Sequence, residues 1–168
     1  KDTNYVRLDE GSRLIQIASI SFDAATFEIW GSLLNGGQLV VMKGWSGQLE
    51  WLGDVLVRHR VNVALLITSP FNMMMEEYHK SLLGIEQLLI GGEALSVPHI
   101  NKALKLLVDT ELINSYGPTE NTTITTCYRI ERRTYDRSIP IGRPISNTEV
   151  LIVDGRGELV AVGITGEL

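Results

Sequence analysis

The sequence predicts an α/β fold, in which a doubly wound, mostly parallel sheet of the flavodoxin-like type precedes a short antiparallel β segment. Short apolar runs alternate with longer amphipathic segments, which is typical of parallel strands joined by helices. Two of the runs, VNVALLIT and QLLIGGE, are apolar almost throughout, as expected for inner strands buried on both faces. Beyond about Thr125, prolines and glycines separate short alternating runs, and this pattern favours antiparallel pairing.

The first two strands and helices follow from local signals. RLIQIAS, residues 13–19, predicts the first strand, and Asp23 then stands as a natural N-cap of the helix AATFEIWGSLL. The stretch Asn35-Gly36-Gly37 ends that helix. QLVVMK predicts the next strand, and after a GWSG turn the apolar residues of a helix from about 48 to 60 fall on one face.

The same alternation continues along the chain. VNVALLIT predicts the third strand, and Ser69-Pro70 begins a helix that runs to Gly84. QLLIGGE predicts the fourth strand, Ser96 caps the helix after it, and ELINSYG predicts the fifth strand. Four strand–helix pairs therefore lead into a fifth strand, and right-handed crossovers between parallel strands are expected.

The chain is expected to divide near residue 125. Residues 1–124 form the α/β subdomain, and residues 125–168 are β-rich and begin a β-barrel-like subdomain that breaks off in mid pattern. Within that segment, Asp154-Gly155-Arg156-Gly157 is placed as a turn between EVLIVD and ELVAVG.

Composition narrows the classes of function. With 44% hydrophobic and 21% charged residues the chain has an ordinary globular composition. A net charge of −5 without a block of Lys and Arg argues against nucleic acid or an anionic membrane surface as a partner. Lone Cys127 favours a reducing, cytoplasmic setting and a packing role, and the three widely spaced histidines do not form a metal-ligand set.

Chemistry is expected in the loops that follow the strands, because ligands of open parallel sheets bind beyond the carboxyl ends of the strands. Gly91 and Gly92 let a flat ligand approach the backbone, although a tight strand-to-helix turn explains such glycines as well. In SYGPTENTT, Tyr116 offers a ring for stacking and Thr119 offers a hydroxyl donor for a phosphate oxygen. Glu120 supplies the hard oxygen that Mg²⁺ takes beside substrate phosphates.

Asp23 has two interpretations. As an N-cap it stabilises its helix by about 1 kcal/mol, which by itself explains an aspartate at this position. It also lies between Phe22 and Ala24 at the expected ligand edge, where a carboxylate in apolar company is costly unless a cation pairs with it. A substrate ammonium group is such a cation.

Several stretches together carry a family resemblance. IASISFDAATFEIWGSLLNGGQLVV, GGEALS, INSYGPTENTT and IPIGRPISNTEVLIVD resemble the adenylation domains of nonribosomal peptide synthetases, in the superfamily that includes acyl-CoA synthetases and luciferases. The resemblance covers essentially all 168 positions. It implies that an amino acid and Mg·ATP give an aminoacyl adenylate and pyrophosphate. The acyl group then passes to the phosphopantetheine thiol of a peptidyl carrier domain.

The resemblance also implies residue roles. Asn114 matches the residue that reads the adenine amino group, and Tyr116 matches the ring stacked on adenine. Thr119 matches the contact to the α-phosphate and Glu120 the Mg²⁺ ligand, which makes these two the catalytic candidates. The whole nucleotide-binding set comprises Gly91, Gly92, Glu93, Ala94, Asn114, Ser115, Tyr116, Gly117 and Thr119.

Asp23 matches the carboxylate that pairs with the substrate α-ammonium group, which favours amino acids over fatty acids. The positions that match the amino-acid pocket are Asp23, Ala24, Phe27, Leu65, Leu89, Gly91, Ser115, Thr123 and Ile124. Large apolar side chains around small ones suit a neutral apolar substrate, with Gly91 leaving depth. Leucine, valine or isoleucine is favoured, and an aromatic amino acid comes second.

The sequence departs from the family pattern in three respects. The Ser/Thr/Gly-rich phosphate loop, the ribose-binding Asp and the small domain with its bridging lysine are all missing from these 168 residues. We therefore expect an internal piece of a larger enzyme, inactive without the remainder of the adenylation domain. Two alternatives remain, namely a piece of an acyl-CoA or aryl-CoA ligase, and a non-catalytic nucleotide-binding module.

Overall fold

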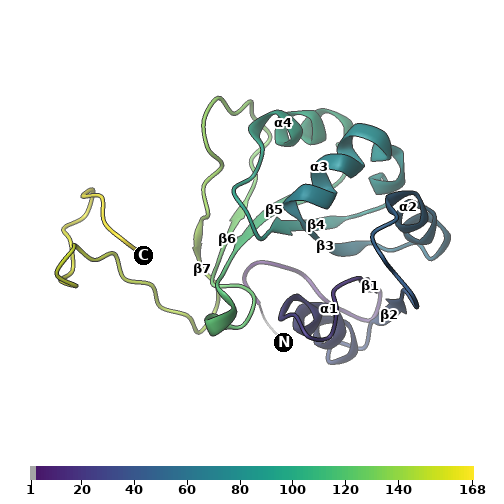
Figure 1. The fold of residues 1–168 in the computed structure, drawn as a ribbon, viewed down its shortest axis with the longest axis horizontal. Helices are drawn as coiled ribbons and strands as arrows, with labels where there is room; N and C mark the ends of the chain where they lie inside the picture. The colour runs from purple at the N-terminus through teal and green to yellow at the C-terminus, as the bar shows by residue number, and fades with distance from the viewer. Residues whose placement is uncertain (1–2) are drawn as a thin grey trace.

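The computed structural model describes residues 3–168 and places seven strands of that range in one sheet, in the order β2-β1-β3-β4-β5-β6-β7 (Figure 1). The strands are β1 (Arg13–Gln16), β2 (Gln38–Val41), β3 (Val63–Ile67), β4 (Gln87–Gly91), β5 (Glu111–Tyr116), β6 (Thr126–Arg129) and β7 (Arg143–Pro144). The helices are α1 (Ala24–Leu33), α2 (Leu49–Arg58), α3 (Thr68–Glu77) and α4 (Val97–Leu106), with short 3₁₀ helices η1 (His79–Leu82) and η2 (Thr119–Asn121).

Strands β1 to β5 are parallel, and the direction in which the chain crosses the sheet reverses at β1. Right-handed crossovers that run in opposite directions place their helices on opposite faces of a sheet. Accordingly α1 covers one face, and α2, α3 and α4 cover the other (Figure 1). The predicted doubly wound α/β fold is confirmed, and its strand order puts the topological switch point between β1 and β3.

The inner strands bury side chains on both faces. Leu88 and Ile90 of β4 pack under α2, α3 and α4, whereas Leu89 between them packs on the α1 side with Phe27. This two-sided burial is the reason that these strands are continuous apolar runs in the sequence.

The two predicted capping residues, Asp23 and Ser96, do not make the side-chain hydrogen bonds of helix caps, although the helices begin close to where they were expected. Asp23 precedes α1, but its backbone is already helical (φ −62°, ψ −28°) and its side chain makes no capping hydrogen bond. A capping side chain needs an extended backbone to fold back over the first turn. Ser96 precedes α4 with its hydroxyl 2.6 Å from Nδ1 of His99 instead. Helix α3 also ends at Glu77, short of the predicted Gly84, and gives way to η1.

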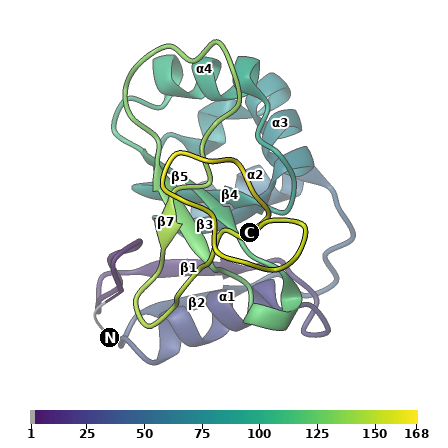
Figure 2. The ribbon, with the colours of Figure 1, turned by 90° about the vertical axis from the view of Figure 1, so that its left-hand side faces the viewer.

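The antiparallel segment begins as part of the same sheet. Strand β6 pairs with β5 and β7 pairs with β6, both antiparallel. The C-terminal segment, yellow in Figure 1, extends away from the sheet, and Figure 2 shows it as loops in front of the strands. The predicted turn is present there, since Oδ1 of Asp154 accepts hydrogen bonds from the backbone N–H groups of Arg156 and Glu158. The division of the chain at residue 125 stays a prediction.

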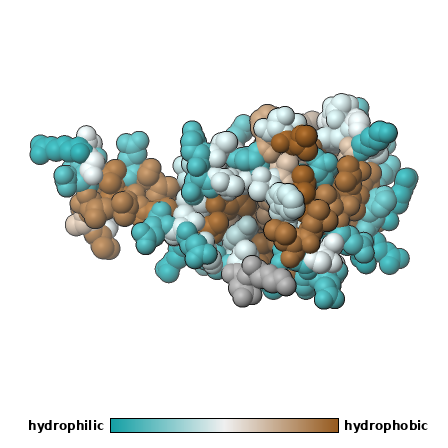
Figure 3. Space-filling view, turned by 90° about the horizontal axis from the view of Figure 1, so that it is seen from below, coloured by the Kyte–Doolittle hydropathy of each residue, from teal (hydrophilic) through white to brown (hydrophobic). Residues whose placement is uncertain are grey.

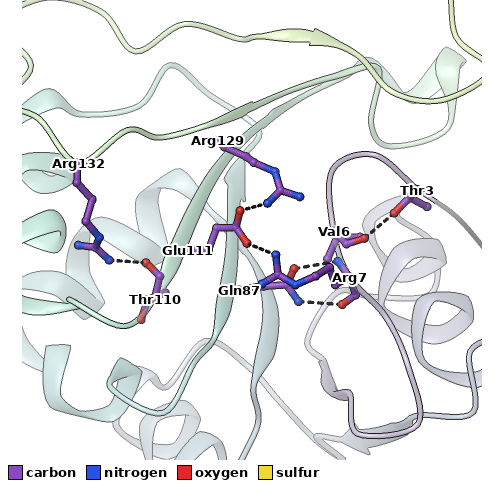
Figure 4. A network of polar contacts seen from close by, with 8 residues as sticks. All are labelled: Thr3, Val6, Arg7, Gln87, Thr110, Glu111, Arg129 and Arg132. Atoms are coloured by element: carbon purple, nitrogen blue, oxygen red, sulfur yellow. Dashed lines mark hydrogen bonds and ion pairs between the residues drawn. The ribbon is translucent and has the colours of Figure 1, made fainter.

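A polar network holds the amino ends of the strands (Figure 4). Buried Gln87, the first residue of β4, accepts a hydrogen bond from the N–H of Arg7 and donates one to its carbonyl, both at 2.8 Å. Glu111, the first residue of β5, forms ion pairs with Arg7 at 3.0 Å and with Arg129. Arg132 donates to the carbonyls that follow α4, including that of Thr110 at 2.8 Å. The contacts of Gln87 and Glu111 with Arg7 tie the N-terminal segment to the sheet at the amino ends of the parallel strands, opposite their carboxyl edge.

Candidate functional site

The carboxyl edge of the sheet, where the five parallel strands end, carries the loops that the sequence singles out. The loop between β1 and α1 contains Asp23, and the loop between β5 and β6 contains residues 117–125. The hydroxyl of Thr123 donates a hydrogen bond to the backbone carbonyl of Asp23 at 2.7 Å. Two loops separated by 100 residues in sequence are therefore in direct contact.

The loop after β5 is tightly folded. Thr122 and Thr123 adopt left-handed backbone conformations (φ 56° and 73°), which are costly for β-branched residues. A Cβ on Gly117 would lie 2.6 Å from the carbonyl oxygen of Thr123, so this close approach requires glycine. The fold of the loop leaves Thr119 and Glu120 exposed on η2.

Two residues of the predicted adenine wall end the fifth strand. Asn114 is buried, and its Nδ2 donates to the carbonyl of Pro140 at 2.7 Å. That bond orients the amide and leaves Oδ1 as the acceptor that reading an adenine amino group needs. Tyr116 is exposed at the end of β5, where its ring is accessible for stacking.

The expectation that Gly91 leaves depth in a pocket is wrong. A Cβ on Gly91 would lie 2.3 Å from the carbonyl oxygen of Ser115, because the neighbouring strand fills that position. The hydroxyl of Ser115 itself donates to the carbonyl of Ile90 at 3.1 Å. Gly92 is exposed with φ +88°, so a tight turn accounts for it, and Glu93 and Ala94 follow as exposed loop residues.

The apolar members of the predicted pocket do come together. Phe27, Leu89 and Ile124 are buried in one cluster on the α1 side of the sheet, and Leu65 packs against it. A hollow of about 270 Å³ beside this cluster is lined by Phe27, Thr123 and Ile124 but extends along α1 to Leu34. The other predicted pocket residues do not line it; these are Asp23, Ala24, Leu65, Leu89, Gly91 and Ser115.

The hollow belongs to an apolar surface around α1. Figure 3 views the molecule from the α1 side and shows apolar side chains gathered there. Ile20 and Phe22 in the loop before α1, and Trp30, Leu33 and Leu34 on the helix, are all exposed.

Ile67 was missed by the sequence reasoning. It is the last residue of β3, its side chain is 54% exposed, and it lies on the same face as Leu65. Ile67 is thus one pleat nearer the carboxyl edge than Leu65, and its Cγ2 lies close to Gly92. The alternation of side chains along a strand was the signal that could have found it.

Thr68, the first residue of α3, was missed as well. Its buried hydroxyl donates to the carbonyls of Gly91 and Glu93, at 3.0 and 3.1 Å. This side chain therefore fixes the loop between β4 and α4. No local pattern in the sequence marks such a contact.

Glu28 on α1 is a further residue that the sequence reasoning overlooked. It is 2% exposed, and its carboxylate accepts hydrogen bonds from the backbone N–H groups of Ile17 and Ala18. Burial raises the pKa of Glu28 to about 7, and the two hydrogen bonds offset this effect in part. The sequence signal is an acid directly beside Phe27 on the stripe of α1 that faces the sheet.

Cys127 lacks the lowered thiol pKa that a nucleophilic cysteine needs. Burial raises the pKa of its thiol to about 12, so the thiol stays protonated at neutral pH. Its side chain packs against the cluster on the α1 side.

The raised pKa of Glu28 predicts a pH-dependent contribution to stability. Because the folded pKa lies above the ordinary value of 4.5, the contribution is complete below pH 4.5 and is lost as pH rises through 7. The loss amounts to about 3 kcal/mol. Urea unfolding of the wild type and of E28Q at several pH values should therefore show E28Q gaining about 3 kcal/mol relative to the wild type over this range. A difference between the two proteins that is constant with pH would contradict the assignment.

Comparison with known proteins matches residues 2–168 to the model of the family described as AMP-binding enzyme. A component of the linear gramicidin synthase of Brevibacillus parabrevis is 47% identical over 169 residues, covering 100% of this chain and 2% of the relative. Tyrocidine synthase 3 of the same organism is 44% identical over 167 residues, covering 99% of this chain and 3% of the relative. This chain thus spans a small share of these relatives' length.

Two solved structures share the fold. One is holo-PA1221, an NRPS protein containing adenylation and PCP domains bound to a vinylsulfonamide inhibitor, with a TM-score of 0.90 and 37% identity over 95% of this chain and 28% of that chain. The other is the N-terminal subdomain of Klebsiella oxytoca NpsA in complex with 3-hydroxyanthranilyl-AMSN. Its TM-score is 0.85 at 25% identity, covering 95% of this chain and 41% of that chain. The resemblance predicted from the sequence is confirmed.

Proposed function

Because this chain belongs to the AMP-binding enzyme family, we propose that it carries the amino-acid pocket and adenine wall of an adenylation domain in a nonribosomal peptide synthetase. The reaction proposed for the complete enzyme joins an amino acid to ATP, giving an aminoacyl adenylate and pyrophosphate. The aminoacyl group is then passed to a phosphopantetheine thiol on a carrier domain.

One observation carries this proposal. The hydrogen bond from Thr123 to the carbonyl of Asp23 brings the loop with a candidate ammonium ligand against the loop that follows Tyr116. The relatives add support, since their names are those of gramicidin and tyrocidine synthases, and one structural neighbour contains adenylation and PCP domains.

Each residue then has a physical role. The Asp23 carboxylate binds the α-ammonium group of the substrate, and Oδ1 of Asn114 accepts a hydrogen bond from the adenine amino group. The ring of Tyr116 stacks on adenine, and the hydroxyl of Thr119 donates to an α-phosphate oxygen. Binding both reactants in one geometry removes much of the entropic barrier to attack of the carboxylate on phosphorus.

Glu120 is the residue proposed to hold Mg²⁺. Its side chain is exposed on η2, and within residues 3–168 it takes part in no ion pair, so its oxygens are accessible to a cation. One carboxylate together with substrate phosphates is a common ligand set for Mg²⁺. When bound, the ion neutralises charge on the phosphates.

The proposed substrate has a neutral aliphatic side chain, with an aromatic amino acid second. Phe27, Leu65, Leu89 and Ile124 pack together in one apolar cluster, and Ile67 adds an apolar side chain at the rim. Ser115 fills the space beside Gly91, so the missing side chain of Gly91 adds no room there, which supports leucine, valine or isoleucine over an aromatic substrate.

Replacement of Asp23 tests the proposed function. In the complete enzyme, D23A should lower kcat/KM for amino-acid-dependent ATP–pyrophosphate exchange by about 100-fold or more. Asp23 is half-buried, and removing one partner of a hydrogen-bonded charge pair at a binding site costs about 2–5 kcal/mol. D54A is the matched control, since Asp54 is exposed on α2. Undiminished activation of a carboxylic acid by D23A would indicate an acyl-CoA or aryl-CoA ligase instead. ATP binding with no response to any amino acid would indicate a non-catalytic nucleotide-binding module.

The 168-residue chain by itself is proposed to be inactive in this reaction. It contains neither the phosphate loop nor the lysine of the family pattern, and these groups supply most of the charge stabilisation at the α-phosphate. The purified chain should therefore give no amino-acid-dependent pyrophosphate exchange above background. Robust turnover by the chain alone would contradict this proposal.

A further inference from the structure

The buried carboxylate of Glu28 performs a specific task in the fold. Its Oε2 accepts hydrogen bonds from the N–H groups of Ile17 and Ala18, both at 3.1 Å, and its Oε1 lies 3.2 Å from the N–H of Ala18. Within residues 3–168, no Lys, Arg or His forms an ion pair with it. Burying an acid without a cation costs free energy, so an apolar residue would serve packing better at this position.

The two N–H groups that Glu28 satisfies lie where the chain leaves the sheet. Gln16 is the last residue of β1 and makes the last pair with β2, opposite Val41. Ile17 and Ala18 follow without a strand partner, and in the described part of the chain no backbone carbonyl accepts from their N–H groups. The carboxylate of Glu28 therefore takes the place of the carbonyl acceptors that a neighbouring strand would supply. In this way it fixes the start of the loop that leads to Asp23.

The rest of this loop has few fixed points. Ile20 and Phe22 are exposed. The backbone N–H of Phe22 donates to the carbonyl of Ser19, which closes a turn over residues 19–22. At the far end, Thr123 holds the carbonyl of Asp23. The loop is thus fastened at its start by Glu28, beside which Nε2 of Gln16 donates to the carbonyl of Ala18. At its end it is fastened by Thr123 and by the first turn of α1, where the N–H of Thr26 donates to the same carbonyl of Asp23 at 2.8 Å. A displacement of about 1 Å at a substrate-binding group lowers activity by up to about 100-fold, so both fastenings bear on Asp23.

We propose that Glu28 is a positioning residue for amino-acid binding, because its buried carboxylate fastens the start of the β1–α1 loop and thereby fixes the place of Asp23. This inference rests on the proposed function, which gives Asp23 its role. It predicts an effect on the amino acid and not on ATP, because the nucleotide contacts lie on the loops after β4 and β5.

A pair of substitutions separates the acceptor from the volume of the side chain. In the complete enzyme, E28M keeps the length and removes the acceptor oxygens, whereas E28Q keeps one carbonyl acceptor. E28M should raise KM for the amino acid by about 10-fold or more while KM for ATP stays within about 2-fold, and E28Q should stay within about 3-fold of the wild type for both. E50M and E50Q at an exposed position of α2 are the matched controls, expected to behave as the wild type.

Amide hydrogen exchange provides a readout that does not depend on activity. The N–H groups of Ile17 and Ala18 should be protected in the wild type and in E28Q, and should exchange about 10-fold faster or more in E28M. Should E28M fail to fold, unprotected amides at these two residues in the wild type would overturn the inference. A 10-fold rise of the amino-acid KM in E28Q would also overturn it, because the carbonyl acceptor is retained there.

The remaining outcomes are equally decisive. Equal changes in both KM values and kcat for E28M would show a general structural defect and overturn the positioning role. Faster exchange in E28M with an unchanged amino-acid KM would do the same. A wild-type enzyme that activates no amino acid at all would instead refute the proposed function. An active wild type together with an E28M variant that shows no selective defect would refute only the positioning role of Glu28.

Discussion

The hydroxyl of Thr123 donates a hydrogen bond to the backbone carbonyl of Asp23, and the site depends on this contact between two loops. Thr123 reaches that position through a left-handed backbone, which is an unfavourable conformation for a β-branched residue. Gly117 makes the conformation possible, because the chain folds back against it more closely than any Cβ would allow. Strain in the loop after β5 is thus offset by contacts that join it to the loop after β1.

The strand order makes this contact possible. Since β1 lies between β2 and β3, the helix that follows β1 covers the opposite face from the other three. On that face, Phe27 of α1 is buried in one cluster with Leu89 of β4 and with Ile124 from the loop after β5. The polar network around Gln87 and Glu111 lies at the amino ends of the same strands, so the contacts that stabilise the sheet are separate from the proposed chemistry (Figure 4).

Features that depend on neighbouring residues in sequence were predictable. The apolar runs and helix periodicities predicted the parallel sheet, and the motif around Tyr116 predicted the family. Features that depend on contacts between distant segments were not. Only the structure shows that Ser115 fills the space beside Gly91, or that Glu28 accepts from the backbone after β1. The predicted cap of Asp23 failed because a capping bond requires a backbone geometry that residue type alone does not specify. That of Ser96 failed although its backbone is extended, because its hydroxyl bonds to the side chain of His99 instead.

The central claim is that Asp23 and the loop after β5 bind one ligand together. A crystal structure of the complete enzyme with a non-hydrolysable aminoacyl adenylate analogue tests it most directly. The claim predicts the ligand's ammonium nitrogen within about 3.2 Å of the Asp23 carboxylate, with adenine stacked on Tyr116. An analogue bound with its ammonium group against other residues, while the Asp23 carboxylate points into solvent, would contradict it.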